Sequence, residues 1–200
     1  MAQLDFWYDF ASTYSYLAAM RCDALAEAAG VALNWRPFLL GPIFAAQGWT
    51  TSPFNLYPAK GRYMLRDIER LGAQRGLKFR APDPFPQNSL LAARLALAVP
   101  EALRPEFSRA VFLAEFGEGR TISDEGLLGE ILAGLGLNAA ETFDKAKSDS
   151  IRAQLRGETE TAQKLGLFGA PSFVAGDGEV FWGDDRLEQA LAWAKDARDK

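Results

Sequence analysis

Two changes of periodicity within the first 37 residues constrain the fold of this chain most. Residues 4–9 alternate in a period of two, which is typical of a strand. Apolar residues then recur at helical spacing over residues 14–29, with Gly30 as a plausible stop. Alternation returns over residues 31–35 and ends at Pro37. Because a helix separates two short strands, we expect a parallel βαβ unit.

The middle of the chain is predicted to be helical. Residues 38–58 are rich in Gly, Pro, Thr and Ser and indicate a long loop, of the kind that often carries function. Helical patterns follow at 58–72, 88–99, 105–116, 123–135, 139–147 and 149–165. Ser123 is a good N-cap for the fourth of these helices and Gly136 a good stop.

The end of the chain returns to strands. A short apolar run at 171–174, a turn at 176–178 and a second run at 179–182 predict a hairpin, and a helix follows over 184–195. The order βαβ, helices, ββα is that of an α/β, thioredoxin-like fold with an all-helical insertion. We therefore expect residues 1–40 and 166–200 to form the thioredoxin-like domain and residues 41–165 the insertion.

Composition excludes several classes of function. The chain has no histidine, which rules out a Ser-His-Asp hydrolase and a Cys/His metal cluster, and we expect no metal site. Its single cysteine, Cys22, excludes an internal dithiol cycle, and its place on an apolar helical stripe predicts a core residue. The net charge of −4 and the scattered basic residues favour no nucleic-acid partner.

The sequence also lacks the patterns of membrane and secreted proteins. No apolar run approaches the roughly 20 residues that span a bilayer. The start, MAQLDFWYDF, has no basic region followed by an apolar run. We expect a cytoplasmic protein with no membrane partner.

Ser12 and Ser15 lie where the first expected strand passes into the first expected helix. Ser12 suits an N-cap, and capping alone would explain it. It is a poor nucleophile without a histidine, and a Ser-Lys arrangement with Lys60 has no further support. Its hydroxyl could instead donate to a thiolate supplied by another molecule. A charge-assisted hydrogen bond of roughly 1.5–3 kcal/mol, with about 0.3–1 kcal/mol from the helix, suffices to lower a thiol pKa from about 8.5 to about 6.5.

Four segments carry a resemblance to a known family: YDFASTYSYLAAMR, LYPAKGRYMLRD, LFGAPSFV and FWGDDRLEQAL. They resemble the 2-hydroxychromene-2-carboxylate isomerases, relatives of the kappa-class glutathione transferases in the DsbA-like branch of the thioredoxin fold. The likeness covers essentially the whole chain. It implies glutathione-dependent isomerisation of 2-hydroxychromene-2-carboxylate to trans-o-hydroxybenzylidenepyruvate in the bacterial breakdown of naphthalene-type aromatics. It also implies a small aromatic carboxylate as substrate and a homodimer.

The resemblance assigns glutathione-binding roles around the first helix. Ser12 matches the serine that stabilises the glutathione thiolate, so it is the expected catalytic residue. Ala170-Pro171 matches a cis-proline turn whose main chain would pair with extended glutathione. Relatives often have Asn in the loop that meets glutathione, where this chain offers Thr50 or Thr51; we name Thr51.

Three charged residues complete the implied glutathione site. Asp184 and Asp185 match the pair that holds the γ-glutamyl end, although as residues at a helix start they could also be a cap and a first-turn acid. Lys60 matches a lysine near the glycyl carboxylate, and without the family it would be a solvated helix charge.

Further polar and aromatic candidates lie in and near the loop. Trp49, Phe54 and Tyr57 are candidates for packing an aromatic substrate, against ordinary burial in the loop. Asn55 and Asn88 are weaker candidates for polar wall residues.

The sequence is compatible with two other functions. A kappa-like transferase or peroxidase would use the same glutathione site and differ only in substrate. A redox-dead thioredoxin-like module would bind a peptide or a partner protein and would need no affinity for glutathione.

Overall fold

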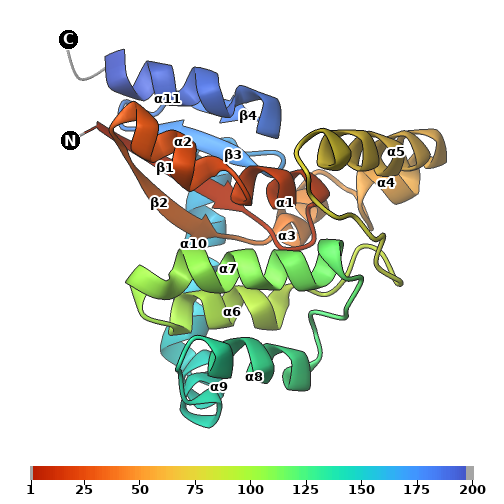
Figure 1. Cartoon of the computed structure of the whole chain (residues 1–200), viewed down its shortest axis with the longest axis vertical. Helices are drawn as coiled ribbons and strands as arrows, with labels where there is room; N and C mark the ends of the chain where they lie inside the picture. Colours follow the sequence, from red (N-terminus) through yellow and green to blue (C-terminus); the bar gives the residue numbers. More distant parts are fainter. Residues whose placement is uncertain (1, 197–200) are drawn as a thin grey trace.

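Both periodicity changes correspond to observed elements in the computed structural model, which describes residues 2–196 (Figure 1). Strand β1 (Ala2–Tyr8) leads into helices α1 (Thr13–Ala19) and α2 (Cys22–Ala29), and strand β2 (Val31–Pro37) follows. Gly30 ends α2 in the left-handed conformation, with φ of 69°, which a glycine adopts readily. The predicted βαβ unit is confirmed, because β1 and β2 pair in parallel.

The end of the chain adds two strands and a helix to this unit. Strands β3 (Ser172–Ala175) and β4 (Val180–Trp182) form the expected hairpin, followed by the 3₁₀ turn η3 (Asp184–Arg186) and helix α11 (Leu187–Asp196). The sheet order is β2-β1-β3-β4, and β3 runs antiparallel to both β1 and β4. The predicted thioredoxin-like fold is confirmed. The proposed domain boundaries stay a prediction.

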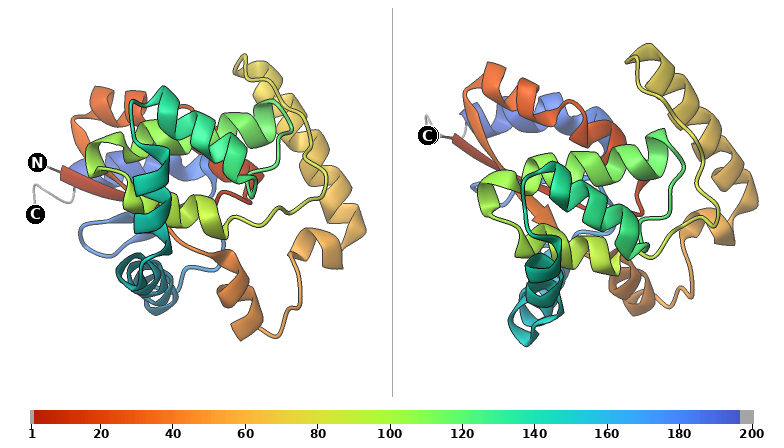
Figure 2. Two further views of the ribbon diagram at one scale, coloured as in Figure 1. Left: turned by 90° about the horizontal axis from the view of Figure 1, so that it is seen from below. Right: turned by 60° about the horizontal axis from the view of Figure 1, so that its bottom comes forward.

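Every element between β2 and β3 is helical. They are α3 (Leu40–Ala46), α4 (Pro53–Leu56), α5 (Pro58–Gln74), α6 (Leu90–Ala98), η1 (Glu101–Leu103), α7 (Arg104–Phe112), η2 (Leu113–Gly117), α8 (Glu125–Gly134), α9 (Ala139–Lys147) and α10 (Asp149–Lys164). Figure 2 shows α4 and α5, in gold, as an arm set apart from the green and teal helices α6–α9.

The sheet buries a different cluster on each face. Leu4, Phe6 and Tyr8 of β1 belong to the main core, with residues of α1, α2, α7 and α11. Trp7 and Val174 belong to a smaller cluster with residues of α3 and α10. Alternate side chains of β1 therefore point to opposite faces of the sheet, as the period of two in the sequence indicates.

The structure differs from the expected helices at three places. The single helix expected over 14–29 is broken between α1 and α2, where Arg21 leaves helical geometry with φ of −135°. The expected loop contains two short helices, α3 and α4, and Leu40, the first residue of α3, donates its N–H to the Asp9 carboxylate at 2.8 Å. Helix α8 is capped by Asp124 and not Ser123, because the Asp124 carboxylate accepts from the Gly126 N–H at 2.7 Å.

A buried carboxyl group lies in the π-helical turn η2. Glu115 is fully buried, and neither of its carboxyl oxygens has a hydrogen-bond partner within residues 2–196. Burial and, to a smaller extent, the Asp9 carboxylate raise the pKa of Glu115 well above its usual range. Burial in this position therefore favours the neutral form of the carboxyl group.

We predict that Glu115→Gln stabilises the protein increasingly as the pH rises. The folded protein keeps a proton that the unfolded chain releases above a pKa of about 4.3, so the stability of the wild type falls from there toward the raised folded-state pKa. Glutamine cannot ionise and avoids this loss. Urea unfolding between about pH 4 and pH 8 should show the gap between variant and wild type widening with pH.

Glu188→Gln is the matched control. A hydrogen bond from Arg21 lowers the pKa of Glu188, so its contribution to stability is present above the unfolded pKa and is lost as the pH falls. Its removal should therefore have the opposite pH dependence. Parallel stability curves for Glu115→Gln and the wild type would show that Glu115 is not held neutral.

Candidate functional site

Ser12 caps α1 and also contacts the far end of the chain. Its Oγ accepts the Ser15 N–H at 3.2 Å, as the capping interpretation predicts. The same Oγ donates to the Ala170 carbonyl oxygen at 2.8 Å, across 158 residues of sequence. The hydroxyl is therefore both a cap and a link to the loop before β3.

That loop is placed by the sheet. Pairing of β1 with β3 puts Trp7 opposite Ser172, so residues 169–171 lie beside the end of β1. The Ala170–Pro171 bond is cis, as the resemblance implies. Ala170 is half-buried and Pro171 is buried. The loop and the first turn of α1 thus form one continuous surface around Ser12.

Only the first serine of the Ser-x-x-Ser pattern faces this surface. Ser15 is fully buried, and its Oγ has no hydrogen-bond partner within residues 2–196. Thr13 is also buried, and its hydroxyl donates to the Met64 sulfur of α5 at 3.1 Å. Because α1 has only seven residues, its dipole contributes little, and the Ser12 hydroxyl is the main polar group available to a ligand.

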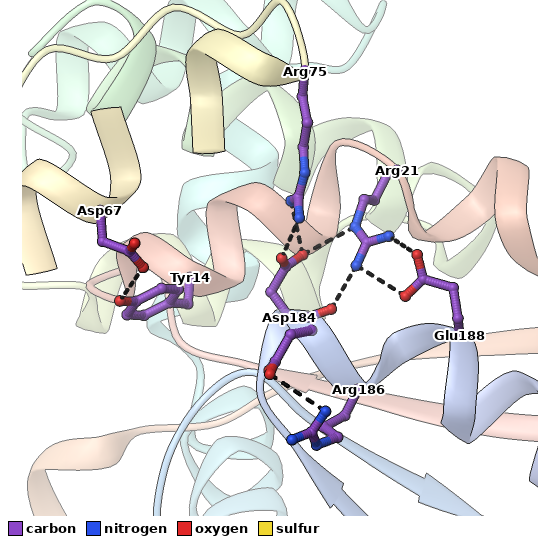
Figure 3. A network of polar contacts seen from close by, with 8 residues as sticks. Tyr14, Arg21, Asp67, Arg75, Asp184, Arg186 and Glu188 are labelled. Carbon is purple, nitrogen blue, oxygen red and sulfur yellow. Dashed lines mark hydrogen bonds and ion pairs between the residues drawn. The ribbon is translucent and has the colours of Figure 1, made fainter. Parts of the chain in front are cut away.

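Two arginines form ion pairs with the Asp184 carboxylate (Figure 3). Its carboxylate accepts from Arg21 Nε at 3.0 Å and from Arg75 Nη2 at 2.7 Å, and only 3% of its side chain is exposed. This differs from the role that the resemblance implies, because a carboxylate with both oxygens in ion pairs is not free to hold a ligand ammonium. Asp184 instead joins the α1–α2 junction, the end of α5 and η3.

Asp185 has the exposure that Asp184 lacks. Its side chain is 73% exposed and pairs only loosely with Arg186 at 3.4 Å. Gly183 has φ of 114°, and a Cβ there would lie 2.5 Å from Asp185 Oδ1, so the glycine leaves room for this carboxylate. Repulsion by the Asp185 carboxylate is the smallest cause of the raised pKa of Tyr14, behind burial, Asp67 and Tyr63, and η3 packs against α1. The structure therefore brings Asp185 to the start of α1.

An open cleft of about 410 Å³ lies between α1 and the α4–α5 arm. Its lining residues come from all three helices: Tyr14, Phe54, Ala59, Lys60, Tyr63 and Met64. Two of the predicted candidates, Phe54 and Lys60, meet here. Tyr14 is two residues from Ser12, so the cleft opens beside the first turn of α1.

The other predicted residues lie outside this cleft. Thr51 is half-buried, and its hydroxyl accepts from Asn55 at 3.1 Å, whereas Thr50 is exposed. Trp49 packs on Phe44, with ring centroids 5.5 Å apart. Asn88 is a local cap, because its side-chain oxygen accepts the Leu90 N–H at 3.0 Å.

Comparison with known proteins places the chain in a family. Residues 3–192 match the family of the DSBA-like thioredoxin domain. The chain belongs to this family.

DSBA-like proteins of two kinds are similar to this chain over nearly its full length. A 2-hydroxychromene-2-carboxylate isomerase of Sphingobium xenophagum is 29% identical, with 92% of this chain and 94% of that protein covered. Glutathione S-transferase kappa 1 of Homo sapiens is 27% identical, with 92% and 87% covered. A solved 2-hydroxychromene-2-carboxylate isomerase superposes with a TM-score of 0.87 at 26% identity, covering 98% of this chain and 97% of that one. These matches confirm the predicted resemblance.

Among the described residues, no three His, Cys, Asp or Glu side chains gather as a metal site would require. Over the same residues, no helix is long and apolar enough to cross a membrane. Cys22 is a free, fully buried thiol whose pKa is raised by burial, which confirms it as a core residue.

Sequence reasoning missed the polar partners that hold α5 against α1. Arg21 and Arg75 lie 163 and 109 residues from Asp184 and read locally as ordinary surface cations. Tyr14 donates its hydroxyl to Asp67 at 3.0 Å, which ties α1 to the middle of α5. The one signal in the sequence was the spacing of Asp67 and Arg75, which are eight residues apart and would share a face of a helix that continued past residue 72.

We predict that Arg75→Met lowers the free energy of unfolding by about 1–3 kcal/mol, because Asp184 then keeps a buried charge with one guanidinium partner in place of two. Chemical denaturation measures this directly. Arg66→Met is the control, since Arg66 forms an exposed pair with Glu69 on the same helix and should change stability by less than about 1 kcal/mol. Equal losses in the two variants would contradict a special role for the Asp184 ion pairs.

Proposed function

We propose that this protein is a glutathione-dependent isomerase that converts 2-hydroxychromene-2-carboxylate to trans-o-hydroxybenzylidenepyruvate. The similarity to proteins named for this isomerase supports the reaction class. The observation that carries the proposal is the Ser12 hydroxyl, which stands at the start of α1 against the Ala170 carbonyl. The same likeness leads us to propose a cytoplasmic homodimer that acts in the breakdown of naphthalene-type aromatics.

The donor groups around Ser12 fit glutathione. A thiolate suits a hydroxyl donor at a helix start, and an extended tripeptide backbone suits the main chain of Ala170. The exposed Asp185 carboxylate suits the free ammonium of a γ-glutamyl group. On the loop side, Thr51 offers a hydroxyl and Lys60 a cation for a carboxylate. We leave Asp184 out of this set because its oxygens are already bound.

Ser12 has a single hydroxyl proton, which donates to the Ala170 carbonyl oxygen. To stabilise a thiolate it must turn away from that carbonyl, which would then need another donor. A backbone N–H of the bound peptide is the natural replacement. Ligand binding would therefore release the Ser12 proton for the sulfur, so that binding and activation are coupled at one atom.

Bound glutathione would supply a thiol that adds to the substrate, turning a double bond into a rotatable single bond, and leaves again after rotation to restore the double bond. The residues of this chain would bind and orient glutathione and polarise its thiol. Serine suits this task better than cysteine, because it stabilises the sulfur without forming a disulfide with it. The absence of histidine is no obstacle, since Ser12 donates a hydrogen bond and attacks nothing.

A kappa-like transferase or peroxidase is the second candidate, favoured by the similarity to glutathione S-transferase kappa 1. It would use the same site, so turnover of 2-hydroxychromene-2-carboxylate with and without glutathione separates the two. A non-enzymatic binding module is a third candidate. It predicts no glutathione affinity, which calorimetry measures.

Ser12→Ala should fold and lose roughly 10- to 100-fold in turnover at saturating glutathione, the value of one hydrogen bond to a charged group. Loss of the cap should lower stability by about 0.5–2 kcal/mol. Ser15→Ala is the control, because Ser15 is buried and its hydroxyl contacts no ligand surface. Wild-type turnover by Ser12→Ala would remove Ser12 from the chemistry.

Asp185→Asn should raise the glutathione concentration needed for half-maximal rate by about five- to thirtyfold, since an ammonium partner is lost. The saturated rate should change little, because the carboxylate would contact the γ-glutamyl ammonium and not the sulfur. The measurement is rate against glutathione concentration. A loss confined to the saturated rate would show that Asp185 does not hold glutathione.

A further inference from the structure

The turn that leads into α1 is organised by one buried carboxylate, that of Asp9. Residue 9 follows β1, at the place where the chain passes on to Ser12 and where α3 also begins (Figure 1). Asp9 Oδ1 accepts the Ala11 N–H at 3.0 Å, and Oδ2 accepts the Leu40 N–H at 2.8 Å. The main-chain carbonyl of Asp9 accepts the Ser12 N–H at 3.0 Å. These three bonds join residues 9–12 to one another and to the start of α3.

The Asp9 carboxylate is buried without a cation beside it. Only 4% of the residue is exposed, and burial raises the pKa of its carboxyl group. Hydrogen bonds from the Leu40 N–H, the Ser89 hydroxyl and the Ala11 N–H act in the opposite direction on this pKa, and no cation within residues 2–196 adds to them. The charged form of Asp9 is therefore stabilised by N–H and O–H donors alone.

Glu115 is the titratable neighbour of Asp9. The Asp9 carboxylate contributes, after burial, to the raised pKa of Glu115, and no cation within residues 2–196 lowers that pKa, Arg94 of α6 included. Helix α3 has no titratable side chain, and Glu106 and Glu118 are exposed. The other titratable groups of β1, α1 and α7 have partners of their own: Tyr8 with Ser108, Tyr14 with Asp67, Tyr16 with the Lys78 carbonyl, Arg104 with the Trp35 carbonyl and Arg109 with Asp23.

The hydrogen-bond donors decide which of the two carboxyl groups carries the charge. Two neighbouring carboxyl groups do not both ionise readily in a buried place. Asp9 accepts two backbone N–H groups, whereas the oxygens of Glu115 accept no hydrogen bond within residues 2–196. The pair therefore holds one proton, on Glu115, and one negative charge, on Asp9. Glu115 lies in the π-helical turn η2, a local geometry that is frequent at functional sites.

We propose that Asp9 is a positioning residue of the thiolate site: its carboxylate fixes the turn that aims the Ser12 hydroxyl, and the neutral Glu115 beside it leaves the charge on Asp9. This rests on the role given to Ser12 in the proposed function. A hydrogen bond weakens steeply when its donor is displaced or turned, so a shift of residues 9–12 would weaken the bond from Ser12 to the sulfur. Asp9 is buried and acts through the turn.

Asp9→Asn keeps the shape of the side chain but removes one of its two acceptors, because the amide NH₂ would face a backbone N–H. Turnover at saturating glutathione should fall by about tenfold or more, since the charge-assisted bonds that hold the turn are lost. The thiol pKa of bound glutathione should move toward that of free glutathione. The glutathione concentration needed for half-maximal rate should change less than the saturated rate, which is the reverse of the pattern expected for Asp185→Asn. Wild-type turnover and thiol pKa in Asp9→Asn would overturn the proposal.

Asp5→Asn is the matched control. Asp5 belongs to the same strand, four residues before the turn, and its carboxylate accepts from the Asn34 amide at 2.9 Å. This variant should leave turnover and the thiol pKa of bound glutathione unchanged. Equal losses in Asp5→Asn and Asp9→Asn would mean that only the charge or stability of the strand matters, which would also overturn the proposal.

An NMR titration of the wild type without glutathione tests the contacts of Asp9 even where Asp9→Asn does not fold. The amide signals of Ala11 and Leu40 should shift together as the pH falls, because both N–H groups bind the same carboxylate. Their common midpoint should lie above the usual aspartate pKa of about 3.9, since burial raises the pKa of Asp9. Amide signals that do not titrate together would contradict the role of Asp9.

The same titration in Glu115→Gln tests the assignment of the proton. The midpoint should stay where it is in the wild type, because Glu115 is already neutral when Asp9 titrates. A midpoint at clearly lower pH would show that Glu115 carries the charge first, which would overturn the proposal. Shared titration of the amides without isomerase turnover would contradict the proposed function alone. Isomerase turnover without shared titration would contradict the role of Asp9 alone.

Discussion

The pairing of β1 with β3 is the constraint on which the candidate site depends. It aligns Trp7 with Ser172 and so carries residues 169–171 to the end of β1, where α1 begins. The hydrogen bond from Ser12 to the Ala170 carbonyl then closes the junction at 2.8 Å. The site combines residues from both ends of the chain, because β1 pairs with β3 as well as with β2.

A buried carboxylate links α5 of the insertion to this junction. Asp184 binds Arg75 at the end of α5 and Arg21 at the break between α1 and α2. Burying a charge is unfavourable unless it is paired. The folded protein therefore keeps both guanidinium groups beside the Asp184 carboxylate. The contact also sets where Asp185 and the cleft beside α1 lie. In this structure the Asp184 carboxylate positions the elements around it through its two arginine partners.

Much of the fold could be predicted because its signals are local. The alternation of β1 and β2 and the bounds of α9 at Ala139–Lys147 follow from periodicity and capping. The break after α1 could not, because it is held by an ion pair 163 residues away and marked by no glycine or proline.

Long-range contacts also decide the different surroundings of the two aspartates at the candidate site. Asp184 and Asp185 are adjacent and chemically identical, and only the tertiary positions of Arg21 and Arg75 make one structural and leave the other exposed. Ser12 could be placed from its cap position, whereas its bond to Ala170 depends on the sheet.

The thiol pKa of glutathione bound to this protein tests the central claim most directly. Thiolate absorbance of the complex, titrated against pH, reports it, and Cys22 does not interfere because burial raises its pKa. We predict a pKa below that of free glutathione, by about one to two units, with most of the shift lost in Ser12→Ala. An unshifted pKa in the wild type, or the same shift in Ser12→Ala, would contradict a thiolate site built on Ser12.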